Sequence, residues 1–274
     1  MHVAITRGVS PEIGQCELTY QSRQRIDLDL ARKQHGQYEE CLAALGCHVH
    51  RLPAEPGLPD SVFVEDAAIV LDEVAVITRP GAESRRPETQ SVAQALGPFR
   101  RLVQIEAPGI LDGGDVLRLG RGLFVGLSRR SNEAAIMQMR NLLAGYGYTV
   151  TGVPVQGCLH LKSAVTQIAA STLLINDRWV DPRVFGPATM IEVDPEEPFA
   201  ANALIIGSRV VFPLAYPSTR KRIERRGIDV CAVDVSELAK AEGGITCCSL
   251  IFPAADPEHE RQGSFCRETR LIHP

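Results

Sequence analysis

Apolar runs broken by a short polar interval recur along the chain, and each is typical of a β-hairpin. The runs occupy residues 67–78, 115–127, 165–176 and 203–213. Their β-branched residues favour extended backbone, and the polar interval in each is short enough for a tight turn. We therefore expect an antiparallel strand pair in each of these runs.

Helical patterns follow several of these hairpins, and a further strand follows each helix. Apolar residues recur at helical spacing between Ala135 and Tyr146, and a second segment that begins with a serine covers 218–226. A glycine directly follows each segment, as it does at many helix C-termini. Strands are then predicted, for example, at 101–105 and 229–233.

The order strand, strand, helix, strand therefore repeats, and such a period predicts units arranged around an axis or along a line. A fifth unit is complete if the late strand 245–252 pairs with 3–6, which an amphipathic helix from Leu28 to Leu45 joins to a strand at 48–52. Pairing the first strand with the last would remove a sheet edge. The expected fold is a closed α/β ring of five ββαβ units, and an open α/β sheet is the alternative.

Composition favours a small-molecule ligand. The 274 residues carry a net charge of −4, with acids and bases interleaved and no basic run longer than 220–226. Nucleic acid and membrane partners are therefore not expected. Because the chain shows no secretory leader pattern and no apolar run near the ~18 residues of a membrane span, we expect a cytoplasmic location. A homodimer is compatible with the sequence.

Two of the eight cysteines, Cys247 and Cys248, are adjacent. A disulfide framework is not expected without a secretory pattern, and a bridge between neighbours would be strained. The chain has no C-x-x-C motif and no paired Cys/His spacing of a structural zinc site. Packing and a nucleophilic role therefore remain for the adjacent pair. The other cysteines, most of which we expect to be small core residues, are Cys16, Cys41, Cys47, Cys158, Cys231 and Cys266.

A closed ring would place the equivalent ends of the first hairpin strands near its axis, where radially repeated folds gather ligand-facing groups. The residues at these ends include a thiol, an imidazole, an amide and several carboxylates. This combination favours a nucleophile over simple packing. The residues are Glu65, Asp66, Asp112, Asp115, His160, Asn202 and Cys247.

Several longer stretches carry a resemblance to a known family. They are LPDSVFVEDAAIV (58–70), ITRPGAESRRPE (77–88), LDGGDVL (111–117), FVGLSRRSN (124–132), LHLKSA (159–164) and GGITCCSL (243–250). They resemble the dimethylarginine dimethylaminohydrolase family of guanidino-group modifying enzymes. The resemblance implies a pseudo-fivefold α/β propeller, the pentein fold, in a single catalytic domain over 1–252. The polar C-terminal tail, 253–274, has no clear counterpart in the family.

The resemblance also implies a thiol hydrolase that converts Nω-methylated L-arginine to L-citrulline and dimethylamine or methylamine, with no cofactor and no metal. Cys247 matches the nucleophile, which would form a covalent S-alkylthiouronium. His160 matches the general acid and base, and Asp112 matches the acid that orients it. We expect Cys248 to pack in the core, because strand alternation would turn it away from the face that Cys247 occupies.

The remaining matches imply substrate recognition. Two carboxylates would bind the guanidinium, two arginines the α-carboxylate, and a third carboxylate with two main-chain carbonyls the α-amino group. In that order, the residues are Asp66 and Glu65; Arg85, in preference to Arg86, and Arg130; and Asp60 with Leu18 and Ala241. The segment around Leu18 would form part of a mobile lid. Ala241 is smaller than the branched residue expected at its place.

Each assignment has a structural alternative: a core histidine for His160, a turn for 112–115 and solvated surface charges for the arginines. Rival activities are those of an arginine or agmatine deiminase and of an amidinotransferase. A pair of arginines for a carboxylate argues against agmatine, which has none. A non-catalytic binder of cationic amino acids, or a thiol redox sensor at Cys247, would use the same residues without turnover.

Overall fold

The computed structural model describes residues 1–254, which form a mixed α/β fold with five three-stranded sheets. In four sheets a hairpin is joined by a third strand parallel to its second strand. The hairpins are β3 (Ala68–Val70) with β4 (Val74–Ile77), β6 (Val116–Leu119) with β7 (Gly122–Leu127), β9 (Val165–Ala169) with β10 (Thr172–Ile175), and β12 (Leu204–Ile206) with β13 (Arg209–Pro213). The third strands are β5 (Arg101–Gln104), β8 (Thr149–Pro154), β11 (Thr189–Glu192) and β14 (Asp229–Val233). All four predicted hairpins are confirmed.

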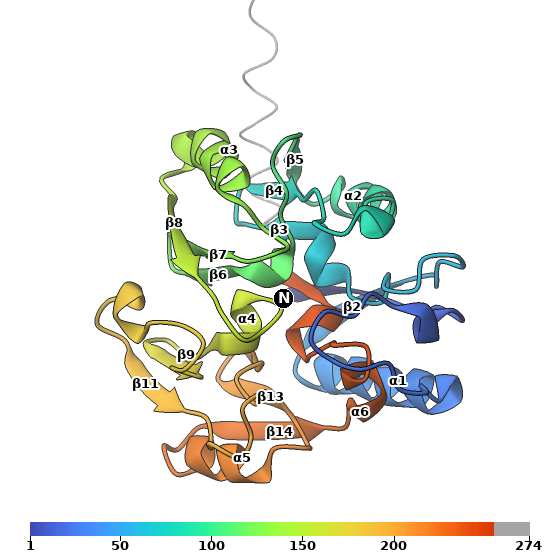
Figure 1. Cartoon of the computed structure of the whole chain (residues 1–274), viewed down its shortest axis with the longest axis vertical. Helices are drawn as coiled ribbons and strands as arrows, with labels where there is room; N and C mark the ends of the chain where they lie inside the picture. The colour runs from blue at the N-terminus through green and yellow to red at the C-terminus, as the bar shows by residue number, and fades with distance from the viewer. Residues whose placement is uncertain (255–274) are drawn as a thin grey trace, which may run out of the picture.

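The fifth sheet joins the two ends of the described chain. Its central strand β1 (His2–Arg7) lies between β15 (Leu250–Pro253) and β2 (Cys47–Leu52). β1 is antiparallel to β15, with Val3 opposite Phe252, and parallel to β2. The predicted pairing of the first strand with the last is confirmed, and Figure 1 shows the red C-terminal strand beside the blue N-terminal segment.

Most units connect their second and third strands through an α-helix. These helices are α1 (Leu28–Ala44), α2 (Glu88–Leu96), α3 (Glu133–Leu143) and α5 (Pro217–Glu224), and they lie on the outer rim of the molecule (Figure 1). The side chain of Asp27 accepts the Leu30 N–H at 3.0 Å and begins α1, and Asn132 caps α3 in the same way. After α3, Gly147 adopts a left-handed φ of 72°, which lets the chain reverse into β8.

The unit of β9, β10 and β11 differs from the predicted pattern, because it has no α-helix. A 3₁₀ helix, Pro182–Phe185, occupies the connection. Pro182 begins this helix, and Gly186 ends it with a φ of 70°. The predicted order strand, strand, helix, strand is therefore only partly met in this unit, where a single 3₁₀ turn replaces the α-helix.

The strand predicted at 245–252 is shorter in the structure. The strand begins only at Leu250, and Thr246–Cys248 instead form a 3₁₀ helix. Cys248 is 1% exposed and belongs to a hydrophobic core cluster, so its predicted packing role is confirmed. The reason given for it is wrong, because no strand alternation applies at this residue.

Two short helices lie close to the predicted site. α4 (Leu161–Ala164) directly follows His160, and α6 (Ser236–Ala239) comes shortly before Ala241. Within residues 1–254, no helix is both long enough and apolar enough to cross a membrane. The predicted tail, 253–274, falls almost entirely outside the described residues, although Pro253 still belongs to β15 and Ala254 donates its N–H to Met1.

Candidate active site

Most predicted site residues line one small cavity of about 20 Å³. Loops at the ends of several units converge there, and the side chains they bring include a thiol, an imidazole, four carboxylates and two arginines. The predicted residues lining it are Asp60, Asp66, Arg85, Arg130, His160, Ala241 and Cys247. Glu65 and Asp112 lie behind them, bonded to lining residues or their neighbours.

Cys247 is half-buried, and its thiol accepts a hydrogen bond from the Gly244 N–H at 3.2 Å. Burial raises the pKa of this thiol to about 12, and the nearby carboxylates of Glu65 and Asp66 add to the effect. The thiol is therefore protonated at neutral pH. A bound cation is the partner that would reverse this, because it offsets the two carboxylates that oppose the thiolate.

His160 lies against Asp112, with 3.0 Å between Nε2 and a carboxylate oxygen. Burial opposes protonation of the ring, but Asp66, Asp112 and Asp115 overcome it and raise the pKa of His160 to about 9. Asp112 is fully buried and also accepts the Gly81 N–H at 2.8 Å. The pair thus has the geometry of an imidazolium held by a fixed carboxylate.

Stability should depend on pH through His160. Since its folded pKa of about 9 exceeds the ordinary 6.5, the protonated ring stabilises the fold fully below 6.5, and this contribution is lost as pH rises through 9. The shift corresponds to a contribution on the order of 3 kcal/mol. His160→Asn should lower the Tm at about pH 6, and the difference from the wild type should shrink towards about pH 10.

Thermal unfolding across this pH range measures the effect, with exposed His48→Asn as the matched control. A Tm difference that stays constant from acid to alkaline pH would show that His160 carries no such charge.

Asp66 is the carboxylate most firmly held in the site. It accepts the Gly114 N–H at 2.9 Å and the Arg85 Nη1–H at 2.6 Å, and it lies 3.9 Å from His160 Nε2. Burial would raise its pKa, but His160 and Arg85 together hold the pKa well below its usual range. Asp66 therefore stays ionised beside the thiol, where it can attract a cationic group.

Arg85 is buried, whereas Arg86 is partly exposed. The Arg85 guanidinium donates to both oxygens of Glu88 and to Asp66. It also donates to the carbonyls of Asp60 and Phe63. Burial lowers its pKa, but Glu88 and Asp66 outweigh this and raise it well above the usual value. Arg85 lines the cavity, but protein oxygens already occupy its donors, so its most evident effect is to fix Asp66.

Arg130 has a different environment. Its side chain is buried, and among residues 1–254 its Nη1 has no hydrogen-bond partner, although the Asp112 carboxylate lies 3.6 Å away. A buried guanidinium N–H without an acceptor is costly, so an anion entering the cavity would be stabilised there. Of the two predicted arginines, Arg130 has the donor free for a carboxylate.

Glu65 binds protein groups with both oxygens. Lys162 Nζ lies 2.6 Å from one oxygen, and the Thr246 hydroxyl donates to the other at 2.7 Å. Asn202 in turn accepts the Thr246 N–H at 2.9 Å. Glu65 therefore supports the helical turn that carries Cys247, in addition to contributing negative charge.

The predicted lid segment lies over the cavity. Glu17 donates its N–H to Asp60 at 3.0 Å, and its carboxylate accepts the Ser84 hydroxyl at 2.6 Å. Burial raises the pKa of Asp60. Leu18 does not line the cavity and packs against the hydrophobic core cluster that contains Cys248. Its predicted contact through the main-chain carbonyl therefore stays a prediction.

Sequence reasoning missed several residues that hold the site. Asp115 was expected near the axis, but its supporting contact was not: it is buried and anchors α4 by accepting the Leu161 N–H at 2.9 Å. Glu88 and Lys162 neutralise Arg85 and Glu65, and nothing in their spacing distinguishes them from surface charges. Only their apolar surroundings in the fold make them partners.

Asp66, Asp112 and His160 offer donor atoms close enough together to hold a metal ion. However, oxygens of both carboxylates already accept backbone N–H groups, from Gly114 and Gly81. A hydrogen-bonded carboxylate pair around a charged imidazole accounts for the same cluster.

Comparison with known proteins decides the family. No family model matches the chain. It is 37% identical over 228 residues to the N(G),N(G)-dimethylarginine dimethylaminohydrolase of Pseudomonas aeruginosa, covering 82% of this chain and 90% of that relative. It is 39% identical over 249 residues to the Streptomyces coelicolor enzyme of the same name, covering 90% of this chain and 95% of the relative. The chain belongs to the dimethylarginine dimethylaminohydrolase family.

Solved structures of dimethylarginine dimethylaminohydrolases share its fold. A cysteine-to-serine mutant of the Pseudomonas aeruginosa enzyme, complexed with citrulline, superimposes with a TM-score of 0.87 at 35% identity over 91% of this chain and 98% of that chain. A histidine-to-glycine form bound as an adduct with S-methyl-L-thiocitrulline gives 0.88 at 34%, over 92% and 100%. The N-terminal domain of a cyanobacterial arginine dihydrolase gives 0.81 at 18% identity over 92% of this chain and 98% of that domain, which shows a common fold alone.

Proposed function

We propose that this protein hydrolyses Nω-methylated L-arginine to L-citrulline and dimethylamine or methylamine. Its family membership supports this activity, as do the relatives' complexes with citrulline and a thiocitrulline. The observation that carries the proposal is a single cavity that brings Cys247 together with His160 and Asp66, with Asp112 bonded to His160 behind it. A nucleophile, a proton donor and a carboxylate that can bind a cation therefore meet there.

In the first half-reaction, the bound guanidinium offsets the charge of Asp66 and Glu65, and the Cys247 thiol loses its proton to solvent. The thiolate attacks the guanidinium carbon, and a C–S bond forms to give a tetrahedral adduct. His160, protonated at neutral pH because its pKa is about 9, gives its proton to the departing nitrogen. The C–N bond breaks, dimethylamine leaves, and an S-alkylthiouronium remains.

In the second half-reaction, neutral His160 takes a proton from water as the water oxygen attacks the same carbon. The C–S bond then breaks, releasing citrulline and the Cys247 sulfur, and the imidazolium is restored. Asp112 holds the ring in one orientation through both steps. The residues thus supply nucleophile, acid and base without a further co-reactant.

Substrate recognition would use charge at both ends of the amino acid. Asp66, together with Glu65, would hold the guanidinium in front of Cys247. Asp60, with the main-chain carbonyls of Leu18 and Ala241, would hold the α-amino group, and Arg130 would bind the α-carboxylate. Arg85 would assist only by releasing some of its present contacts with Glu88 and Asp66.

We propose that the five sheets form a pseudo-fivefold α/β propeller of ββαβ-type units, closed by the pairing of β1 with β15. Residues 1–252 would form one catalytic domain and 253–274 a tail. A cytoplasmic location and a homodimer stay predictions.

Arginine deiminase and amidinotransferase activities use the same attack on a guanidinium carbon. Parallel assays of citrulline from asymmetric dimethylarginine, monomethylarginine and arginine, with the released amine quantified, separate them. Stoichiometric dimethylamine supports the proposal. Turnover of arginine alone would replace it with a deiminase, and citrulline-free transfer to an added amine would replace it with a transferase.

Arg130 should set the affinity for the α-carboxylate. Because its buried Nη1 has no acceptor within the described chain, Arg130→Ala should raise the KM for dimethylarginine by ~10²-fold. For dimethylated agmatine, which lacks the carboxylate, the same substitution should change the KM little. Steady-state kinetics on both substrates measure the effect, with exposed Arg129→Ala as the matched control. Equal losses on the two substrates would contradict a carboxylate contact.

A further inference from the structure

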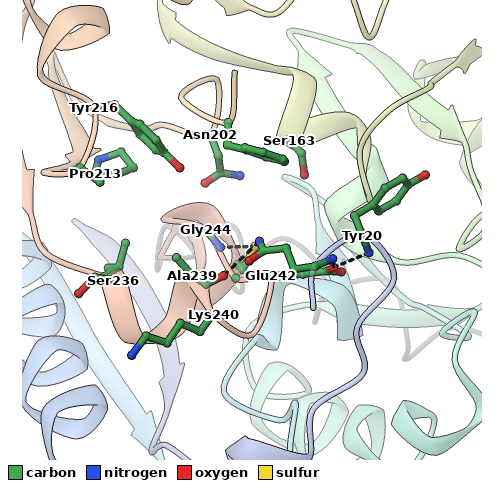
Figure 2. A pocket seen from close by; sticks show the side chains of 16 residues that line it. Tyr20, Ser163, Asn202, Pro213, Tyr216, Ser236, Ala239, Lys240, Glu242 and Gly244 are labelled. Atoms are coloured by element: carbon green, nitrogen blue, oxygen red, sulfur yellow. Dashed lines mark hydrogen bonds between the residues drawn. The ribbon is translucent and has the colours of Figure 1, made fainter. Parts of the chain in front are cut away.

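Glu242 forms an unusual junction between the lid segment and the nucleophile loop. Its carboxylate accepts the backbone N–H of Tyr20 and of Gln21, each at 2.6 Å, and that of Thr19 at 3.1 Å. Successive N–H groups that converge on one carboxylate form an anion-binding concavity, in which each hydrogen bond is charge-assisted. Figure 2 shows the Glu242 side chain extended towards the backbone of Tyr20.

The backbone of Glu242 is also unusual. It is the one non-glycine residue within 1–254 with a positive φ, 58°, in the left-handed region that side chains disfavour. Such a conformation persists only where its surroundings enforce it, and it often marks a functional segment. Here the enforced turn aims the carboxylate at the lid, and two residues later the Gly244 N–H points at the thiol.

The neighbours of Glu242 belong to the site already described. Ala241 lines the cavity on one side of it, and the Gly244 N–H donates to the Cys247 thiol on the other. Glu242 itself lines both the 20 Å³ cavity and a larger one of about 460 Å³, bounded by Tyr20 and Gln21 of the lid. The lid contact therefore lies on the wall between the two cavities.

The small cavity holds little more than a water molecule, and an amino acid cannot enter it without movement. The backbone of the lid, residues 17–21, is held by Asp60 at Glu17 and by Glu242 at 19–21. Release of the Glu242 contacts would open the small cavity towards the larger one. Their formation would close the lid and bring the turn at 241–244 into place with it.

We propose that Glu242 is a positioning residue that latches the lid and couples its closure to the alignment of the Cys247 loop. This inference rests on the proposed function only for its kinetic consequence, since the latch itself is testable without substrate. Loss of the carboxylate should leave the lid open more often and should misplace the Gly244 donor. The catalytic groups themselves would remain.

Limited trypsin digestion tests the latch directly. Arg23 and Arg25 are exposed just beyond the latched segment, and Arg23 is also tied to the carbonyls of Gly14 and Cys16. Glu242→Ala should speed cleavage at these two arginines by ~10-fold or more with little change in Tm, because the lid opens locally. Mass spectrometry identifies the cut, and exposed Glu40→Ala is the control.

Two further variants separate the carboxylate from the backbone. Glu242→Gly removes the latch but relieves the left-handed φ, so it should be cleaved as fast as Glu242→Ala. Glu242→Gln keeps an accepting oxygen and should fall between Glu242→Ala and the wild type. If Glu242→Gly is cleaved at the wild-type rate, only the turn matters and the latch is wrong. The latch is also wrong if faster cleavage merely follows a fall in Tm.

Kinetics give the second readout. Glu242→Ala should lower kcat/KM for dimethylarginine by ~10-fold or more, mainly through KM, because open states bind substrate weakly. A fall in kcat alone, with KM and cleavage unchanged, would place Glu242 in the chemistry and overturn the latch. A wild type that does not turn over methylarginines, yet shows the same cleavage differences among variants, would refute the substrate assignment and retain the latch.

Discussion

Replacing Cys247 by serine should abolish citrulline formation from dimethylarginine, lowering kcat by at least ~10⁴-fold. Serine keeps the size of the side chain but is a far weaker nucleophile, and His160, which is protonated at neutral pH, cannot serve as the base that would ionise it. Binding should survive, because the carboxylates and Arg130 are untouched. Citrulline and dimethylamine release measure turnover, and citrulline retention by the variant measures binding.

The neighbouring cysteine provides the control for Cys247. Cys248→Ala removes a thiol of the same segment whose side chain packs in the core, so it should lower Tm slightly while kcat stays within about threefold. If Cys247→Ser retains substantial turnover, or if Cys248→Ala loses as much activity, the assigned nucleophile is wrong. Mass spectrometry of a trapped adduct would then identify the reacting residue.

His160→Asn should lower kcat by ~10²–10⁴-fold, because the leaving amine and the attacking water would both lose their proton carrier. In the wild type, kcat/KM should fall as pH rises through about 9, where the imidazolium of the free protein loses its proton. Asp112→Asn should move this fall to lower pH, since the hydrogen bond from Asp112 supports the protonated ring. Rate profiles from neutral to alkaline pH measure both effects.

A suitable control for the pH profile is Arg129→Ala, which changes an exposed charge near the site loop without touching His160. An alkaline fall that persists at the same pH in Asp112→Asn would mean that another group titrates. An His160→Asn variant with near-normal kcat would remove the residue from the mechanism altogether.

Much of the fold was predictable because hairpins leave a local signal. The alternation in 115–127 and the glycine that follows α3 are each sufficient to predict an element. The errors arose where the signal is tertiary. The 245–252 run reads as one strand, but the hydrogen bonds of Thr246 to Asn202 and Glu65 fold its first half into a helical turn.

The residue types of the site were predictable, but the hydrogen bonds and ion pairs between them were less so. Cys247, His160 and Asp112 follow from motif and residue type, and the structure places His160 against Asp112. Arg85 is saturated because folding pairs it with Glu88, whereas Arg130 keeps an Nη1 without an acceptor among residues 1–254. Likewise, the contacts of Glu242 with 19–21 join segments far apart in sequence, so no local pattern could reveal them.

The pairing of β1 with β15 also has a consequence for biosynthesis. Strand β1 leaves the ribosome long before its antiparallel partner β15 is made. Because Cys247 lies just before β15, the sulfur and the completed sheet both appear only when this last described strand is made. A nascent chain therefore cannot assemble the reactive centre early. The centre becomes complete only at the stage when β1 and β15, which are far apart in the described sequence, can pair.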